Sequence, residues 1–214
     1  MKRLLAALTM LIATPALAHH PLGDMQMETF AHGVLSGIGH PVLGFDHLFF
    51  VVIVGVTAML TGRKYSAPMA YIVTMLLGCL MMSLGIGLPL KETVIALSLL
   101  VVGYIVLSGR GAALAPAMIA FAAFGLFHGS AFGDSMAAQE SGVGSAVLIG
   151  YLIGLGVVQY VIALASGLFM EKVLGTVEAS SLNARLAGAA VAGVGLFLTM
   201  EALEGPALVA LGLS

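Results

Sequence analysis

Charged side chains are scarce in this sequence. Only 8% of its 214 residues are Asp, Glu, Lys or Arg, against about 25% in a typical soluble domain. Hydrophobic residue types make up 60% of the chain, and the mean hydropathy is +1.12. So few charges cannot cover a surface that faces water. The composition therefore excludes a soluble globular domain and predicts that the outer solvent is lipid.

Cysteine and clusters of basic residues are also nearly missing. Cys79 is the one cysteine and lies in an apolar run. The chain therefore cannot form an internal disulfide, and we interpret this residue as a small buried hydrophobe. The formal net charge is −2 at pH 7 without a basic tract, which argues against nucleic acid as a partner. The sequence also has no G-x-x-x-x-G-K-[ST] loop, and so no ATP-binding site of that type.

The N-terminus has the three parts of a secretory signal peptide. Lys2-Arg3 supplies positive charge, a short apolar stretch follows, and Ala16-Leu17-Ala18 is an A-x-A cleavage site. A retained transmembrane helix is the alternative, but the apolar stretch is short and is broken by Pro15. We therefore predict a signal peptide at residues 1–18. The mature chain would then begin at His19, outside the membrane.

Six apolar runs are long enough to cross a membrane, since a helical span needs about 20 residues. Each run is about twice the length of a barrel strand and none alternates with period two, which favours helices. We predict an all-α membrane protein in which residues 40–214 form one six-helix transmembrane domain. Residues 19–39 would form a short periplasmic leader. The predicted spans are about 41–61, 67–88, 92–109, 112–132, 143–169 and 185–204.

The distribution of basic residues orients these spans independently of the signal peptide. With both termini outside, the inside loops carry most of the Lys and Arg residues, and the outside segments carry only Lys91. This bias is the one that the positive-inside rule requires. We therefore predict that both termini of the mature chain are periplasmic. The basic residues of the inside loops are Arg63, Lys64, Arg110, Lys172 and Arg185.

Two histidines and an aspartate stand where the first predicted span begins. An ionisable group at a helix centre in a bilayer costs about 3 kcal/mol on insertion scales, so such residues are functional candidates. Pro41 suits the first helical position, and His40 and His47 lie near one helix face with Gly44 between them. Imidazole plus carboxylate suits Ni, Co, Zn or Cu. Asp46 would be a ligand or would orient a histidine. The alternative is an Asp–His pair that only packs helices.

A second polar position, His128, lies in the fourth predicted span. By the predicted orientation this span runs from inside to outside, so His128 lies in the outer half of the bilayer, level with His40 and His47. Two segments far apart in sequence are thus predicted to meet at one membrane depth. This makes His128 a candidate ligand, with a hydrogen-bonded core residue as the alternative. Asp134 lies near the interface, and we interpret it as a solvated loop carboxylate or an auxiliary metal-capture group.

The predicted leader offers a weaker metal-capture group. After signal cleavage, the free amine of His19 and the imidazoles of His19 and His20 would lie together at the new N-terminus. His32 adds a further imidazole in the same segment. Imidazole and amine nitrogens are suitable ligands for divalent transition metals. The alternative is a polar remnant of cleavage without a role.

The arrangement His40-Pro-x-x-Gly44-x-Asp46-His47, followed by an apolar helix, resembles the HupE/UreJ family. Phe127-His128-Gly129 in a later span, the A-x-A signal peptide and the six-span count extend the resemblance to the whole chain. The resemblance implies a nickel or cobalt permease of the bacterial inner membrane that serves hydrogenase or urease maturation. It implies that the ion is a substrate without any tightly bound cofactor, and that a metallochaperone or maturation system is a partner. The implied metal-binding residues are His40, Asp46, His47 and His128.

The sequence departs from the family pattern in three places. The second family motif resembles F-H-G-x-A-H-G-x-E, but Phe132 stands where its second histidine would be. Asp134 replaces the glutamate one position early, and the fifth span lacks the histidine often found there, with Tyr151 as the nearest polar group. Fewer imidazoles predict weaker nickel binding or a different choice of metal.

Two other functions compete with transport. An intramembrane zinc hydrolase would use His and Asp to activate water, but the sequence has no H-E-x-x-H motif and no convincing nucleophile elbow. A structural or haem-binding membrane subunit would use histidines on facing helices as axial ligands. We predict that the protein is not an enzyme and transports a divalent transition metal.

Overall fold

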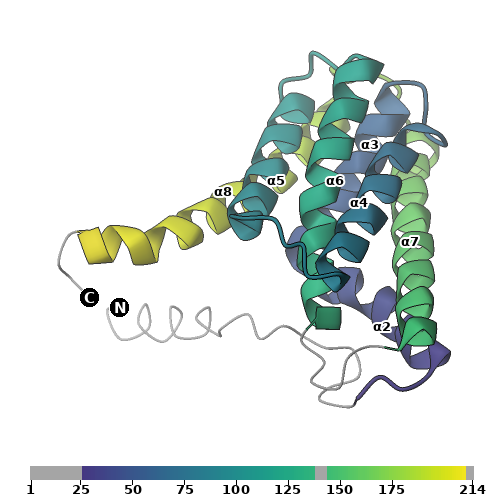
Figure 1. The fold of residues 1–214 in the computed structure, drawn as a ribbon. Helices are drawn as coiled ribbons and strands as arrows, with labels where there is room; N and C mark the ends of the chain where they lie inside the picture. The colour runs from purple at the N-terminus through teal and green to yellow at the C-terminus, as the bar shows by residue number, and fades with distance from the viewer. Residues whose placement is uncertain (1–25, 138–143, 211–214) are drawn as a thin grey trace, which may run out of the picture.

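The computed structural model describes residues 26–137 and 144–210, and the regular structure in these ranges is helical (Figure 1). The predicted all-α class is confirmed. The predicted signal peptide, together with His19 and His20, lies outside the described residues. The helices are α2 (Phe30–Leu43), α3 (Phe45–Leu60), α4 (Ala67–Ser83), α5 (Lys91–Leu107), α6 (Leu114–Ala137), α7 (Ser145–Leu168), which continues into the π-helical turn η1 (Phe169–Val173), and α8 (Leu182–Ala210).

Three segments in the described part of the chain are long and apolar enough to cross a membrane, or four if the bent pair of α2 and α3 is one span. Helices α4 and α5 have 17 residues each. At 1.5 Å per residue they are about 25 Å long, at the lower limit for a span. Six crossings therefore remain a prediction. The three long segments are Leu114–Asp134, Ser145–Val173 and Leu182–Glu204.

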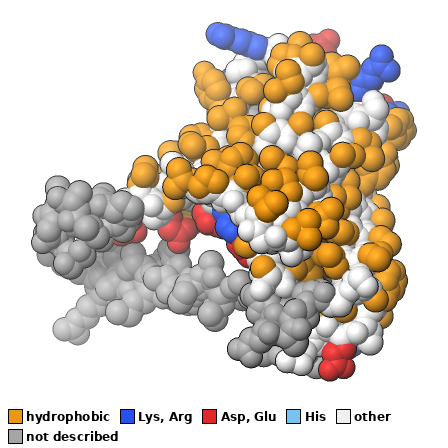
Figure 2. All heavy atoms as spheres, viewed as in Figure 1, with side chains coloured by type: hydrophobic (Ala, Val, Ile, Leu, Met, Phe, Trp, Pro, Cys, Tyr) orange, Lys and Arg blue, Asp and Glu red, His pale blue; other side chains and the backbone are white. Residues whose placement is uncertain are grey.

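The surface of the molecule is that of a membrane protein. Hydrophobic side chains are spread over the face shown in Figure 2, and large ones are widely exposed, such as Ile119 at 69% and Leu186 at 57%. At the predicted inner end, Lys64 in the α3–α4 loop pairs with Glu171 of η1 at 2.5 Å. The hydrogen bond to the Glu171 carboxylate raises the pKa of Lys64. Ion pairs at the ends and an apolar belt between them fit a bilayer.

The first predicted span begins in a different way from the prediction. Pro41 does not start a helix but lies inside α2, near its end. Gly44 is extended (φ −85°, ψ 105°) and interrupts the helix. Helix α3 therefore makes an angle of 83° with α2. Helix α2 includes residues 30–39 of the predicted leader and packs along α7. This packing offsets the cost of a proline within a helix, about 3 kcal/mol, because it gives α2 a buried face of its own.

Small residues let the helices pack in three close pairs around α3: α2 with α7, α4 with α6, and α5 with α8. Gly33 and Gly37 of α2 lie against the backbone of α7 at Val147 and Tyr151. In the α4–α6 pair, Gly129 lies against the Met75 carbonyl. Such contacts need backbones closer together than any side chain would permit. The pairs hold α3, which carries the candidate site, at their common centre.

Replacing Gly129 by alanine should destabilise the α4–α6 pair. The added methyl group would overlap the Met75 carbonyl, and overpacking of this kind typically costs about 1–3 kcal/mol. The matched control is Gly193→Ala in α8, where the added methyl group meets nothing within 4 Å and helix propensity improves. We expect a lower thermal unfolding midpoint in detergent for the first variant only. Equal midpoints would show that the contact tolerates a side chain.

Candidate metal site

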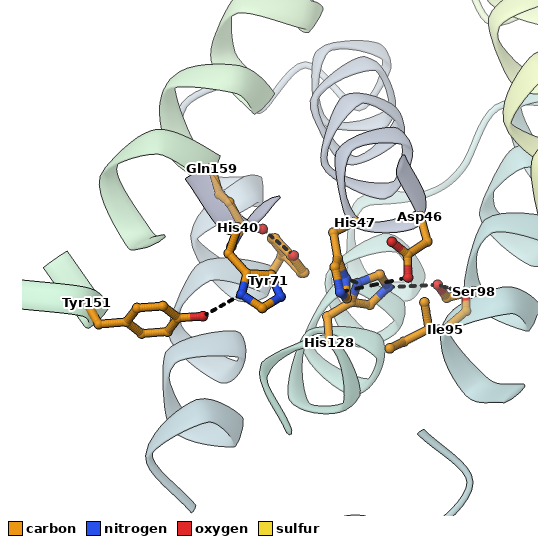
Figure 3. A network of polar contacts seen from close by, with 9 residues as sticks. All are labelled: His40, Asp46, His47, Tyr71, Ile95, Ser98, His128, Tyr151 and Gln159. Atoms are coloured by element: carbon orange, nitrogen blue, oxygen red, sulfur yellow. Dashed lines mark hydrogen bonds and ion pairs between the residues drawn. The ribbon is translucent and has the colours of Figure 1, made fainter. Parts of the chain in front are cut away.

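The predicted site residues come from three helices that meet near the helix break (Figure 3). His40 lies in the last turn of α2, Asp46 and His47 lie in the first turn of α3, and His128 lies in α6. His47 is 7% exposed and His128 is fully buried. In one straight helix, His40 and His47 would be about 10 Å apart along the axis. The break at Gly44 brings their ring centroids to 6.2 Å.

A chain of hydrogen bonds fixes the orientation of His47. Its Nδ1 lies 2.9 Å from Nδ1 of His128, and Nε2 of His128 lies 3.0 Å from the Ser98 hydroxyl of α5. The hydroxyl donates its one hydrogen to the carbonyl of Ile95 at 2.6 Å, so it accepts from His128 Nε2–H. Nδ1 of His128 is then an acceptor, and His47 donates its Nδ1–H to it. This leaves Nε2 of His47 with a lone pair.

His40 is held in the same way from the other side. The Tyr151 hydroxyl donates to the carbonyl of Phe132 at 3.1 Å and lies 3.3 Å from Nδ1 of His40. Because its hydrogen is used, Tyr151 accepts from His40 Nδ1–H. Nε2 of His40 is then the unprotonated nitrogen of the neutral ring, and in Figure 3 it lies on the side of the ring that faces His47. Hydrogen bonds of this kind set the tautomer of metal-binding histidines.

The lone pair of His47 lies beside a carboxylate. Nε2 of His47 lies 3.8 Å from Oδ2 of Asp46, too far for a hydrogen bond. Two ligand atoms that are each about 2.1 Å from an ion are at most about 4.2 Å apart, so one ion fits between this nitrogen and this oxygen. A side chain at Gly44 would crowd both groups, since its Cβ would lie 3.0 Å from the His47 ring and 3.2 Å from the Asp46 carboxylate.

The site is open in this conformation. Among residues 26–137 and 144–210, no three His, Cys, Asp or Glu side chains surround one point closely enough to hold an ion. His47 and Asp46 form a near-ligand pair, and His40 would have to move toward them to complete a set of three. Both ring nitrogens of His128 are hydrogen-bonded, so in this arrangement His128 orients His47.

Aromatic rings enclose the imidazoles. The Phe132 ring lies 4.1 Å from the His47 ring and 5.3 Å from the His40 ring, centroid to centroid. Phe132 is fully buried, so the residue that departs from the family pattern packs against both histidines. On the inner side, Phe50 stacks on His128 at 4.3 Å. These rings exclude water from the imidazoles and strengthen electrostatic interactions there.

The predicted auxiliary residues have other partners. Nδ1 of His32 accepts a hydrogen bond from the Glu28 backbone N–H at the start of α2, two turns from His40. Asp134 is not in a loop, as the interpretation required. It lies in α6, and its side chain pairs with Lys91 of α5, because α6 extends five residues beyond the predicted end of its span. The auxiliary role of His32 stays a prediction.

Three residues near the site were missed in the sequence or given a lesser role. Ser98 is one hydroxyl in an apolar run, and only the fold shows that it meets His128. Tyr151 was noted only as a polar group in the fifth span. Glu92 stands at the edge of a span, where a carboxylate is ordinary, yet it lies within electrostatic range of Asp46. Helix packing, which the sequence does not show directly, brings these residues to the site.

Comparison with known proteins shows the family of the chain. The family model described as HupE / UreJ protein matches residues 6–198. The chain is 31% identical over 195 residues to Protein HupE of Rhizobium leguminosarum bv. viciae, which covers 87% of this chain and 92% of that relative. No solved structure matches the chain. The family match and the relative both cover the segments that carry His40, Asp46, His47 and His128, and the chain therefore belongs to the HupE/UreJ family.

Proposed function

We propose that this protein carries a divalent transition metal, Ni²⁺ or Co²⁺, across the bacterial inner membrane from periplasm to cytoplasm. The observation that carries the proposal is the Nε2 lone pair of His47, which lies 3.8 Å from the Asp46 carboxylate at a helix break, with the His40 ring 6.2 Å from the His47 ring. In this proposal the chain crosses the membrane six times, with both termini periplasmic, and the ion is the substrate. Family membership supports a role in supplying a metalloenzyme, such as a hydrogenase or urease.

The ligand set favours ions of borderline softness. Imidazole nitrogen suits Ni, Co, Zn and Cu, whereas Mg and Ca prefer sites made only of oxygen. One carboxylate neutralises half of the charge of a divalent ion. The partial negative charge at the C-terminal end of α2 adds to this attraction, as at the broken helices of other transporters.

The incomplete coordination suits a transporter. A structural metal site has four protein ligands and holds its ion tightly. Here the protein offers at most three ligand side chains near the break, and His40 and His47 lie on different helices. A movement of α2 relative to α3 would separate His40 from His47 and release the ion. Weak binding with easy separation of ligands permits turnover.

Uptake into proteoliposomes tests the proposal. The purified full-length protein would be reconstituted and supplied with Ni²⁺, Co²⁺, Zn²⁺ or Cu⁺, with protein-free vesicles as the control. We expect uptake of Ni²⁺ or Co²⁺ above the control. Vesicles that take up none of the four ions would refute transport. Hydrolysis of a lipid or peptide would then support the zinc hydrolase, and a Soret band in the purified protein would support the haem subunit.

Replacing Tyr151 by phenylalanine should weaken ion binding at the site. The variant keeps the ring but loses the hydroxyl that accepts from His40 Nδ1–H, so the His40 ring loses a hydrogen bond that orients Nε2 toward the ion. Loss of such an orienting partner typically lowers metal affinity about 10–100-fold. The measurement is the KM for uptake, and the control is Tyr160→Phe, since Tyr160 is on the same helix but bonds to the Tyr65 carbonyl. Equal KM values for the two variants would contradict the orienting role.

A further inference from the structure

A second polar cluster lies inside the helix bundle, apart from the histidines. Tyr71 and Met75 are one turn apart on α4, and Gln159 faces them from α7; all three are fully buried. The Tyr71 hydroxyl donates to Oε1 of Gln159 at 2.5 Å. The Gln159 amide donates in turn to the Met75 sulfur at 3.6 Å. The cluster thus brings two oxygens and a thioether sulfur together in the interior of the bundle.

This cluster lies inward of the histidines along the predicted direction of transport. On α7, Gln159 is eight residues after Tyr151, about 12 Å further along the helix axis. The Tyr71 ring lies 6.0 Å from the His128 ring and 5.4 Å from the Phe50 ring. An ion that leaves the outer site for the cytoplasm would therefore meet this cluster.

The cluster also joins two of the helix pairs. Tyr71 belongs to the α4–α6 pair and Gln159 to the α2–α7 pair. Helices α4 and α7 contact each other less than the two helices within either pair do. A simple role would be to hold the pairs together, since buried amides and hydroxyls bond across membrane helices. A polar group of this kind at depth in a membrane protein is also a candidate part of an ion pathway.

The chemistry of the three ligand atoms fits a borderline ion in transit. A thioether sulfur is a soft ligand, and amide and phenol oxygens are neutral ones, so the set would bind a partly dehydrated transition metal without holding it strongly. An ion there would replace the two internal hydrogen bonds by bonds to Tyr71 Oη, Gln159 Oε1 and Met75 Sδ. The outer site, in contrast, has the negative charge of Asp46 to attract the ion.

We propose that Tyr71, Met75 and Gln159 form a second, inner binding station for the transported cation. This inference rests on the proposed transport function and adds the step that follows capture at His40, Asp46 and His47. The station selects softer ions through the Met75 sulfur, and its lack of charge allows release toward the cytoplasm.

Replacing Met75 by leucine tests the sulfur ligand. Leucine keeps the volume but cannot bind an ion, so inhibition of Ni²⁺ uptake by the soft ion Cd²⁺ should weaken by about tenfold, within the range for lost metal-site partners. The control is Met69→Leu on the same helix, where Met69 is 44% exposed. If the substitution only loosened the packing between the helix pairs, it would lower the uptake of all ions alike. Unchanged inhibition by Cd²⁺, or an equal loss of uptake for all ions, would overturn the proposal.

Replacing Gln159 by glutamate tests the same station without measuring transport. The change keeps the shape and adds a charge, so an ion should remain bound there, and purified protein should bind about two Ni²⁺ ions in place of one. Retained binding at the outer site shows that the variant is folded. A Gln159→Glu protein that binds the outer ion alone would contradict the station. Lack of uptake by the wild type would instead refute the proposed function, whatever this stoichiometry is.

Discussion

Replacing His47 by alanine should reduce Ni²⁺ uptake in proteoliposomes to nearly that of protein-free vesicles. The change removes the Nε2 lone pair that faces Asp46 at 3.8 Å and also leaves Nδ1 of the buried His128 without its partner. Loss of an orienting partner alone lowers metal affinity about 10–100-fold, and loss of the ligand itself should cost at least as much. We therefore expect uptake to fall at least tenfold.

The control for this variant is His32→Ala. His32 also lies in α2, but its ring accepts a backbone hydrogen bond at the start of that helix and lies away from the site. We expect it to keep most of the uptake. If the two alanine variants lost uptake equally, the effect would reflect general damage to the fold, and if neither lost uptake, His47 would not be a ligand.

Replacing Phe132 by histidine should have the opposite effect on binding. The ring at this position lies 4.1 Å from the His47 ring and 5.3 Å from the His40 ring, and an imidazole is small enough to occupy the same space. It would offer a fourth protein ligand, and closed four-ligand sites hold their ions tightly. We expect Ni²⁺ affinity of the purified protein to rise about tenfold or more, while the maximal uptake rate falls because release is slower.

The matched control is Phe132→Leu, which removes the ring and adds no ligand. It should leave the affinity close to that of the wild type. An affinity that rose equally in both variants would show that relief of crowding, and not a new ligand, is the cause. An unchanged affinity in Phe132→His would mean that position 132 does not face the bound ion.

Much of the fold follows from local sequence patterns, but the helix break does not. The apolar runs predicted the position of each long helix; α7 was predicted at 143–169 and is found at Ser145–Leu168, whereas α6 and α8 extend five and six residues beyond their predicted ends. Pro41 was assigned to a helix start, since proline is favoured there. In the structure it lies near a helix end. What decides between the two is the packing of α2 on α7, which depends on residues more than 100 positions away.

The candidate site, like the fold, could be predicted only in part from the sequence. The predicted convergence of the two histidine segments is confirmed, since His47 and His128 are 2.9 Å apart. It could be predicted because the expected topology places both segments at one membrane depth. The hydrogen-bond partners could not, because Ser98 is one of several hydroxyls in apolar runs, and only the rotation of α5 about its axis points it at His128. The metal-binding roles themselves stay predictions.

X-ray absorption spectroscopy at the nickel edge, on the ion-loaded full-length protein, tests the central claim most directly. The account predicts about two imidazole ligands, together with oxygen ligands, at roughly 2.0–2.2 Å. It also predicts the loss of one imidazole in either His40→Ala or His47→Ala. A bound ion surrounded by oxygen alone, or an imidazole count that neither variant changes, would contradict the assignment of His40 and His47 as ligands.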